Sequence, residues 1–163
     1  MPLRIAAKIP RSDRGHFKQR LQPLIDGEQI QLTGEVDEGT KEDFLGAAAA
    51  LLFPINWPEP FGLVMIEAMA CGTPVIAFRS GSVPEVIDEG VTGFVVDDED
   101  AAVRAIGRLG QLDRRRVRGG YEQRFTASRM AEEYVRCYRS LIGGKSRESV
   151  RQKVQGTASQ YWR

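Results

Sequence analysis

The sequence predicts an α/β protein built on a parallel sheet with helices on both faces. Short apolar runs alternate along the chain with longer stretches of helical period, which is the βαβα order of such sheets. The chain has 163 residues, of which 42% are hydrophobic and 28% charged, values that are ordinary for a soluble globular protein. A chain of this length is able to bury a substantial core.

Each element follows from a local signal in the chain. We expect strands at Leu3–Ile9, Ile30–Val36, Leu51–Ile55, Val75–Phe78 and Gly93–Val96. We expect helices at Gly15–Ile25, Thr40–Ala50, Phe61–Cys71, Pro84–Asp88, Asp97–Leu109, Arg114–Phe125 and Ala127–Ile142. Thr40, with Asp43 three residues on, is close to a capping box. Pro60 suits a first helical turn, and Gly72 with Pro74 suits the end of the same helix.

We divide the chain into a folded domain at residues 1–142 and a polar tail at 143–163. The last expected helix carries one apolar stripe, a pattern more typical of a docking face than of a cofactor site. Its members are Met130, Tyr134, Cys137, Tyr138 and Leu141. After Gly143 and Gly144 the chain turns polar and loses its period, which predicts a flexible tail.

Composition excludes several classes of protein. A formal net charge of +1 gives no attraction to nucleic acid, and two cysteines make no disulfide framework. A single histidine, His16, is too little to complete a metal site. No segment is long and apolar enough to span a bilayer, and the first residues lack the apolar core of a signal peptide. We therefore expect a cytoplasmic protein.

The most informative stretch is Trp57–Ala77, because it places Glu59 and Glu67 eight residues apart around the start of a helix. At a rise of ~1.5 Å per residue the two glutamates are about 12 Å apart along the axis. The free N–H groups and positive dipole end of a helix N-terminus suit a diphosphate. A carboxylate accepts hydrogen bonds from a ribose diol. This layout fits a sugar nucleotide.

These residues resemble the group 1 family of retaining glycosyltransferases, which have the GT-B fold and carry two glutamates with seven residues between them. The resemblance covers roughly Pro2 to Ile142 and is to the C-terminal, donor-binding domain, which is Rossmann-like. Besides the glutamates, it rests on the blocks Leu32–Val36, Phe53–Pro54, Arg79–Glu85 and Gly90–Val96.

The resemblance implies a role for each matching residue. Glu59 corresponds to the glutamate that faces the transferred sugar, and we assign it as the catalytic residue, acting by positioning and electrostatics and not as a nucleophile. Glu67 corresponds to the glutamate that binds the ribose diol. The predicted substrate-binding residues are Glu67, Phe61, Gly62, Leu63, Gly34, Val36 and Gly81. Gly34 and Val36 lie near the base by resemblance, although a simple turn after a strand explains them equally well.

The chain departs from the family pattern at its beginning. In the family, a strand and a loop with a diphosphate-binding arginine and lysine precede the segment that Pro2 opens, and we expect this strand to be missing here. In a sheet of order 3-2-1-4-5-6 it would be central. The strands Leu3–Ile9 and Leu51–Ile55 would then pair directly or receive a strand from another chain. Either arrangement leaves exposed edges that allow self-association.

We predict a domain that binds a nucleoside diphosphate sugar, with uridine or guanosine as the base, for retaining transfer of a hexose. The acceptor, which is a sugar, a lipid or a small molecule, would be held by an N-terminal domain outside this chain. The donor is the substrate, and no further cofactor and no metal are expected. A binding module or a truncated remnant without turnover is the alternative. A nucleotide-sugar epimerase lacks support because its acid-base residues are missing, and a receiver-like domain would need clustered aspartates at strand ends.

The run Arg114–Arg116 leaves one further alternative open. It could meet an acidic membrane surface as a peripheral contact, but a solvated helical face is the more ordinary explanation of such a run.

Overall fold

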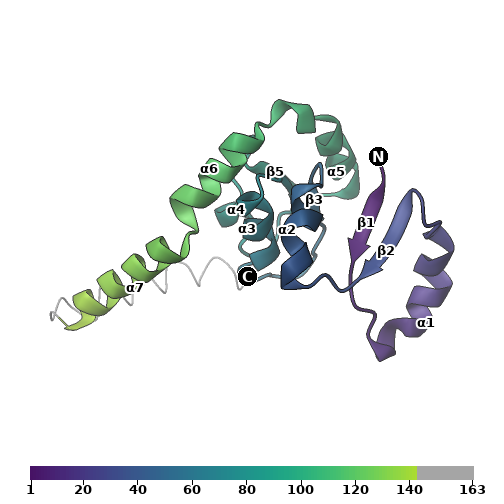
Figure 1. The fold of residues 1–163 in the computed structure, drawn as a ribbon, viewed down its shortest axis with the longest axis horizontal. Helices are drawn as coiled ribbons and strands as arrows, with labels where there is room; N and C mark the ends of the chain where they lie inside the picture. The colour runs from purple at the N-terminus through teal and green to yellow at the C-terminus, as the bar shows by residue number, and fades with distance from the viewer. Residues whose placement is uncertain (143–163) are drawn as a thin grey trace. The chain divides into compact units, whose positions relative to one another are not determined.

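A computed structural model describes residues 1–142 and divides them into two compact units, Met1–Phe44 and the described residues from Leu45 onward. The order of the elements along the chain can be followed by colour in Figure 1. The predicted tail, residues 143–163, lies outside the described residues.

The first unit is a βαβ arrangement. Strand β1 (Leu3–Ala6) pairs in parallel with β2 (Ile30–Gly34), and a helical segment connects them. This segment begins four residues earlier than the expected helix and changes its winding along its length: η1 (Arg11–Asp13), α1 (Arg14–His16), η2 (Phe17–Leu21, a π turn) and η3 (Gln22–Leu24). Before β2, one oxygen of Asp26 accepts hydrogen bonds from three successive backbone N–H groups, at 2.7 to 2.9 Å. These bonds, that of Ile30 first, lower the pKa of the Asp26 carboxyl.

Helix α2 (Glu38–Gly46) is capped by a different residue from the one predicted. Asp37 accepts from the backbone N–H of Thr40 at 3.0 Å and from its hydroxyl at 2.8 Å. Thr40 therefore lies inside the first turn, and the side-chain bond from Thr40 is the main reason that the pKa of Asp37 is lowered. The helix also ends at Gly46. The alanines that follow, which were expected to be helical, lie outside it.

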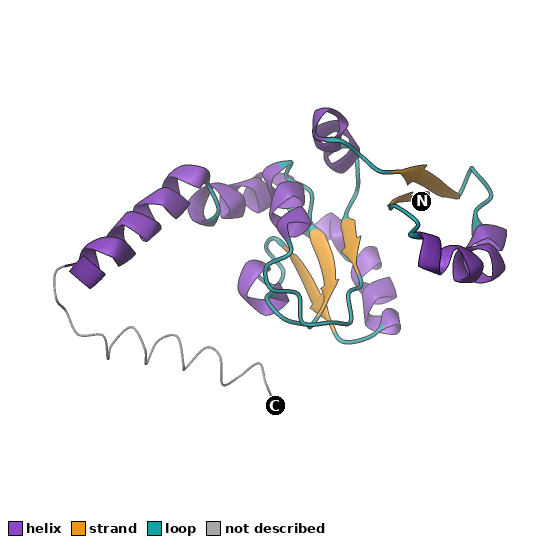
Figure 2. Ribbon diagram, turned by 90° about the horizontal axis from the view of Figure 1, so that it is seen from below, coloured by secondary structure: helices purple, strands orange, loops and turns teal. Residues whose placement is uncertain are grey.

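The second unit contains a parallel sheet of order β3-β4-β5, with helices on both sides of it in Figure 2. Its strands are β3 (Leu51–Phe53), β4 (Val75–Phe78) and β5 (Gly93–Val96), so the last two match the predicted ranges at both ends. Strand β4 is central, and Val75, Ile76 and Ala77 are all buried. A continuous apolar run is the pattern expected of a strand covered on both faces.

The helices of this unit follow the predicted order with small shifts in their ends. They are α3 (Leu63–Ala70), α4 (Val83–Val86), α5 (Glu99–Gly107), the 3₁₀ turn η4 (Leu109–Gln111), α6 (Arg114–Arg124) and α7 (Ala127–Ile142). Asp98 caps α5 by accepting from the N–H of Ala101, and Asp113 caps α6 by accepting from that of Arg115. The helix expected from Asp97 onward thus begins at Glu99, directly after an acidic cap.

All strand pairs are parallel, as predicted, but the described strands form two sheets and not one. Strand β1 is paired with β2, and β3 with β4. The Leu3–Ile9 and Leu51–Ile55 strands belong to different units, so their pairing stays a prediction.

The core of the second unit is built on the two faces of its sheet. On one face Ile76, Phe94 and Val96 pack with Ala105 of α5. Met65, Ala68 and Met69 of α3 are fully buried, as is Val117 of α6. The apolar side chains of α3 are thus covered by other elements, as expected for a helix that packs in a core. This packing fixes the position of the helix and of the residues at its two ends.

Arg114 of α6 links the end of α2 and the residues just after it to the turn between α3 and β4. Its guanidinium donates to the carbonyl oxygens of Ala48 and Gly46, both at 2.7 Å, and to the buried hydroxyl of Thr73 at 2.8 Å. The Thr73 hydroxyl in turn donates to the carbonyl of Leu45 at 2.8 Å. Arg118 caps α3 in the same way, through the carbonyl of Ala70. The arginine run at the start of α6 is therefore partly structural.

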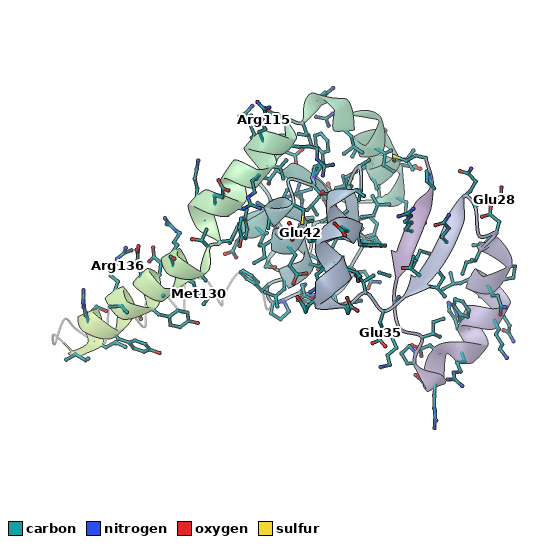
Figure 3. All side chains as sticks on the ribbon, viewed as in Figure 1. Glu28, Glu35, Glu42, Arg115, Met130 and Arg136 are labelled. Carbon is teal, nitrogen blue, oxygen red and sulfur yellow. The ribbon has the colours of Figure 1, made fainter. Side chains whose placement is uncertain are left out.

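Helix α7 presents an exposed apolar stripe within the described residues. Met130, Tyr134, Tyr138 and Leu141 are all exposed, and the two tyrosine rings lie 6.3 Å apart. Met130 and Arg136 extend from different sides of this helix in Figure 3. Among the helices of residues 1–142, none combines the length and hydrophobicity that a membrane span requires.

We expect Arg114→Ala to lower the free energy of unfolding by about 1.5 to 3 kcal/mol, because several carbonyls and the buried Thr73 hydroxyl lose a charged donor. Urea denaturation followed by circular dichroism measures this loss. Arg116→Ala is the matched control, since Arg116 is an exposed residue of the same helix. Equal losses for the two variants would contradict the structural role of Arg114.

Candidate functional site

Two loops meet at one edge of the sheet in the second unit. The loop Trp57–Gly62 follows β3 and leads into α3, and the loop Arg79–Ser82 follows β4 and leads into α4. Because β3 and β4 are parallel neighbours, their carboxyl ends lie at the same edge. In open α/β sheets this edge is where ligands bind.

The two loops are joined through their backbones. The N–H of Ser82 donates to the carbonyl of Glu59 at 2.9 Å, and the Ser80 hydroxyl donates to the carbonyl of Trp57 at 2.7 Å. Gly81 has φ = +52°, and a Cβ at this position would lie 2.3 Å from the Glu59 carbonyl oxygen. Only glycine permits this approach. The path of the Glu59 loop is therefore set by the loop after β4.

The Glu59 carboxylate is half-buried and accepts two hydrogen bonds from its own loop. One oxygen accepts from the backbone N–H of Gly62 at 3.1 Å, and the other accepts from the Trp57 indole N–H at 3.3 Å. Each carboxylate oxygen has two acceptor positions. The carboxylate is thus oriented by the protein and keeps capacity for further donors.

Helix α3 begins later than predicted, and Pro60 lies outside it. The residue before its first turn is Gly62, in the left-handed conformation at φ = 71°. This conformation redirects the chain after Pro60, so that Leu63 is the first helical residue. Gly62 has no side chain to cap the helix, and among the described residues its first turn contains no acidic group. The positive end of the helix dipole is therefore not compensated by its own first turn.

Glu67 is half-buried and lies one turn after Leu63. The predicted separation of about 12 Å measured both glutamates along one helix axis. In the structure Glu59 is in the preceding loop, and its carboxylate folds back to Gly62. Only about 6 Å of helical rise separates Leu63 from Glu67. The two glutamates therefore do not share one helix axis, and the separation of their carboxylates stays a prediction.

Phe61 and Leu63 place apolar surface beside the same helix end. Phe61 is 41% exposed and packs edge-to-face on Phe125, with ring centroids 6.3 Å apart. Leu63 is 63% exposed. The Phe125 ring is itself covered by the Arg124 guanidinium at 4.7 Å. Phe61 is therefore an oriented but accessible side chain.

The structure brings most of the predicted site residues into one unit: Glu59, Phe61, Gly62, Leu63, Glu67 and Gly81. Gly34 and Val36 belong to the first unit. Gly34 ends β2 with φ = +80°, and next to it the Thr33 hydroxyl donates to the carbonyl of Ile5 at 3.1 Å. These features describe the end of a strand, and the contact of Gly34 and Val36 with a base stays a prediction.

Trp57 and Ser80 also contribute to this site, although the sequence pattern predicted no role for either. The available signal was an aromatic residue two positions before Glu59 in the same motif. The bond from Ser80 joins loops that are 23 residues apart, and no local pattern reports it. Among residues 1–142, no group of three or more His, Cys, Asp or Glu side chains is placed to hold a metal ion.

We expect Gly81→Ala to destabilise the fold by at least 2 kcal/mol more than Gly90→Ala. Both glycines have a left-handed φ, but a Cβ at Gly81 meets the Glu59 backbone, whereas one at Gly90 meets nothing within 4 Å. Gly90→Ala thus measures the cost of the conformation alone, about 1 to 2 kcal/mol. The comparison is made by urea denaturation, and similar losses would show that the loops separate easily.

Comparison with known proteins agrees with this geometry. The family profile of glycosyl transferases group 1 matches residues 12–124. The phosphatidyl-myo-inositol mannosyltransferase of Mycolicibacterium smegmatis is 27% identical over 158 residues, which cover 93% of this chain and 39% of the relative. The D-inositol 3-phosphate glycosyltransferase of Corynebacterium jeikeium is 35% identical over 109 residues, 61% of this chain and 26% of the relative. The chain therefore spans well under half of these relatives.

Solved structures show the same fold. HepE of Anabaena, crystallised with UDP and glucose, matches with a TM-score of 0.73 at 20% identity, over 85% of this chain and 40% of that one. The sucrose-phosphate synthase of Thermosynechococcus elongatus matches with a TM-score of 0.72 at 28% identity, over 88% of this chain and 38% of that one. The chain belongs to the group 1 family of retaining glycosyltransferases and corresponds to the C-terminal domain of their GT-B fold.

Proposed function

We propose that this domain binds a nucleoside diphosphate sugar and serves a retaining transfer of its hexose. The acceptor would be held by an N-terminal domain outside this chain. The observation that carries the proposal is the position of the Glu59 carboxylate, which the protein holds beside the uncapped N-terminus of α3. An anion-binding helix end next to an oriented hydrogen-bond acceptor matches the two halves of a donor, the diphosphate and the hydroxyl-bearing sugar.

The names of similar proteins support a nucleotide sugar. HepE of Anabaena has been crystallised with UDP-glucose and with UDP. The curated relatives are named as a mannosyltransferase and a glycosyltransferase. Uridine is accordingly the first base to test and guanosine the second. The hexose is left open, because selection among hexoses depends on a few hydroxyl contacts.

Each site residue has a distinct task in the proposed mechanism. The backbone N–H groups at the start of α3 would stabilise the negative charge that develops on the departing diphosphate. Glu67 would accept from the ribose diol. Glu59 would accept from hydroxyls of the transferred sugar and hold it in line with the acceptor. Because both Glu59 oxygens already accept bonds from the protein, positioning suits this residue better than nucleophilic attack.

The proposal also covers the acceptor and the cellular location of the protein. A sugar, a lipid or a small molecule would be the acceptor. The proposed location is cytoplasmic, because two cysteines in a chain of 163 residues make no disulfide framework. Binding without turnover is the second candidate for this chain alone, since the chain spans 39% of the mannosyltransferase and 26% of the D-inositol 3-phosphate glycosyltransferase.

Calorimetric titration of the purified chain tests the proposal. The ligands are UDP, GDP, UDP-glucose and GDP-mannose. Saturable binding of one nucleotide and its hexose conjugate is expected. A folded chain that binds none of the four would contradict a donor site in this domain.

We expect Glu67→Ala to weaken binding of the preferred nucleoside diphosphate by about 1 to 3 kcal/mol, because charge-assisted hydrogen bonds to the ribose are lost. Titration calorimetry measures the change. Glu132→Ala, at an exposed position of α7, is the control and should leave affinity unchanged. An unchanged dissociation constant for Glu67→Ala would remove this residue from the site.

We expect Glu59→Gln to spare the nucleoside diphosphate and to weaken its hexose conjugate. The amide nitrogen of glutamine donates and cannot accept, so one of the two acceptor oxygens is lost where the sugar hydroxyls would bind. Both ligands are titrated against the same preparation. Equal losses for the two would assign Glu59 to the loop structure and not to the sugar.

A further inference from the structure

Trp57 is far more exposed than a tryptophan normally is. It is 56% exposed, whereas tryptophan is on average among the well-buried residues. Phe61 and Leu63, four and six residues further on, are also exposed. Three accessible apolar side chains therefore fall within seven residues, in the loop that carries Glu59 and at the first residue of α3. Exposed apolar surface of this kind, next to oriented polar groups, marks a binding surface.

The Trp57 side chain is held in place although it is exposed. Its indole N–H donates to the Glu59 carboxylate at 3.3 Å, and its carbonyl accepts from the Ser80 hydroxyl at 2.7 Å. Pro58 follows it and restricts the backbone of Trp57 to extended conformations. The residue is thus fixed at both its ring edge and its backbone, and its ring loses little freedom when a ligand covers it.

We propose that the exposed face of the Trp57 indole is the surface on which the hexose of the donor packs. This inference rests on the proposed function and adds to it a residue for the sugar half of the site. A pyranose ring has an apolar face of C–H groups and a rim of hydroxyls. Here a flat apolar ring lies beside a carboxylate that accepts hydrogen bonds, and the indole N–H joins the two.

The same bond argues for the sugar and against the other parts of the donor. Trp57 is connected to Glu59, and Glu59 lies before the helix end that suits the diphosphate. A hydroxyl donates to the carboxylate next to the indole, whereas a phosphate oxygen only accepts and forms no hydrogen bond with it. A hexose meets both groups favourably, with its C–H face on the ring and its hydroxyls on Glu59.

The experiment separates the sugar from the nucleotide. We define the hexose increment as the ratio of the dissociation constant of the nucleoside diphosphate to that of its hexose conjugate. It is measured by calorimetry with UDP and UDP-glucose, and with GDP and GDP-mannose, for the parent chain and for Trp57→Ala and Trp57→Phe. Tyr134→Ala is the matched control, since Tyr134 is an aromatic residue with the same 56% exposure on α7.

We expect Trp57→Ala to lower the hexose increment about eightfold, the ratio that corresponds to about 50 Å² of apolar surface taken out of water. Trp57→Phe keeps an aromatic ring and should lower the increment less than threefold. Tyr134→Ala should leave it unchanged. Melting curves of each variant confirm that it is folded.

Fluorescence gives an independent measure on the intact site. The chain has two tryptophans, so Trp162→Phe leaves Trp57 as the only one. In that background the hexose conjugate should change the emission of Trp57 more than the nucleoside diphosphate alone does. The same emission change with both ligands would contradict the inference.

The remaining outcomes are equally decisive. Equal losses of affinity for both ligands in Trp57→Ala, or no loss for either, would overturn the role of Trp57 while leaving a working nucleotide site. If the parent chain binds neither ligand, the proposed function itself fails, and this inference fails with it.

Discussion

The structure of the candidate site depends on one contact between backbones, that of Gly81 against Glu59. A Cβ at Gly81 would lie 2.3 Å from the Glu59 carbonyl oxygen and 2.5 Å from its nitrogen, so the two loops touch with no side chain between them. The bonds from Ser82 and Ser80 lie on either side of this contact. This contact fixes the path of the backbone at Glu59, from which the carboxylate reaches the N–H of Gly62. Parallel pairing of β3 with β4 brings the loops to the same edge in the first place.

Helix α3 is held at both ends by groups from elsewhere in the chain, and this explains why its own first turn is left uncapped. Its C-terminal carbonyls receive donors from Arg114 and Arg118 of α6, and Gly72 turns the chain away at φ = +69°. Its apolar side chains are buried in the core. Packing and the C-terminal arginines thus stabilise the helix, so its N-terminus does not need the usual capping side chain. An uncapped N-terminus leaves backbone donors for a ligand, which is the arrangement that anion sites require.

The geometry also limits the chemistry of Glu59. A carboxylate that already accepts from a backbone N–H and an indole N–H is stabilised as an oriented hydrogen-bond acceptor. Such a group is suited to holding hydroxyls in place, since each oxygen keeps a second acceptor position for them. Membership of a retaining family and the geometry of this loop are therefore compatible with a mechanism in which the protein positions the reactants and stabilises charge.

The sequence by itself determined the fold class, the order of nearly every element and the residues at the carboxyl edge of the second sheet. Strands β4 and β5 and helix α7 match their predicted ranges because each depends on a local pattern of apolar residues bounded by turn residues. Tertiary structure alone decided how the loops meet. The cap of α2 moved from Thr40 to Asp37, and Pro60 fell outside α3 because Gly62 turns the chain with a left-handed φ. Pairing within each unit, β1 with β2 in the first and β3, β4 and β5 in order in the second, was likewise decided by tertiary structure. The contributions of Trp57 and Ser80 depend on the contact with a loop more than 20 residues away in the chain, and for that reason the local sequence does not reveal them.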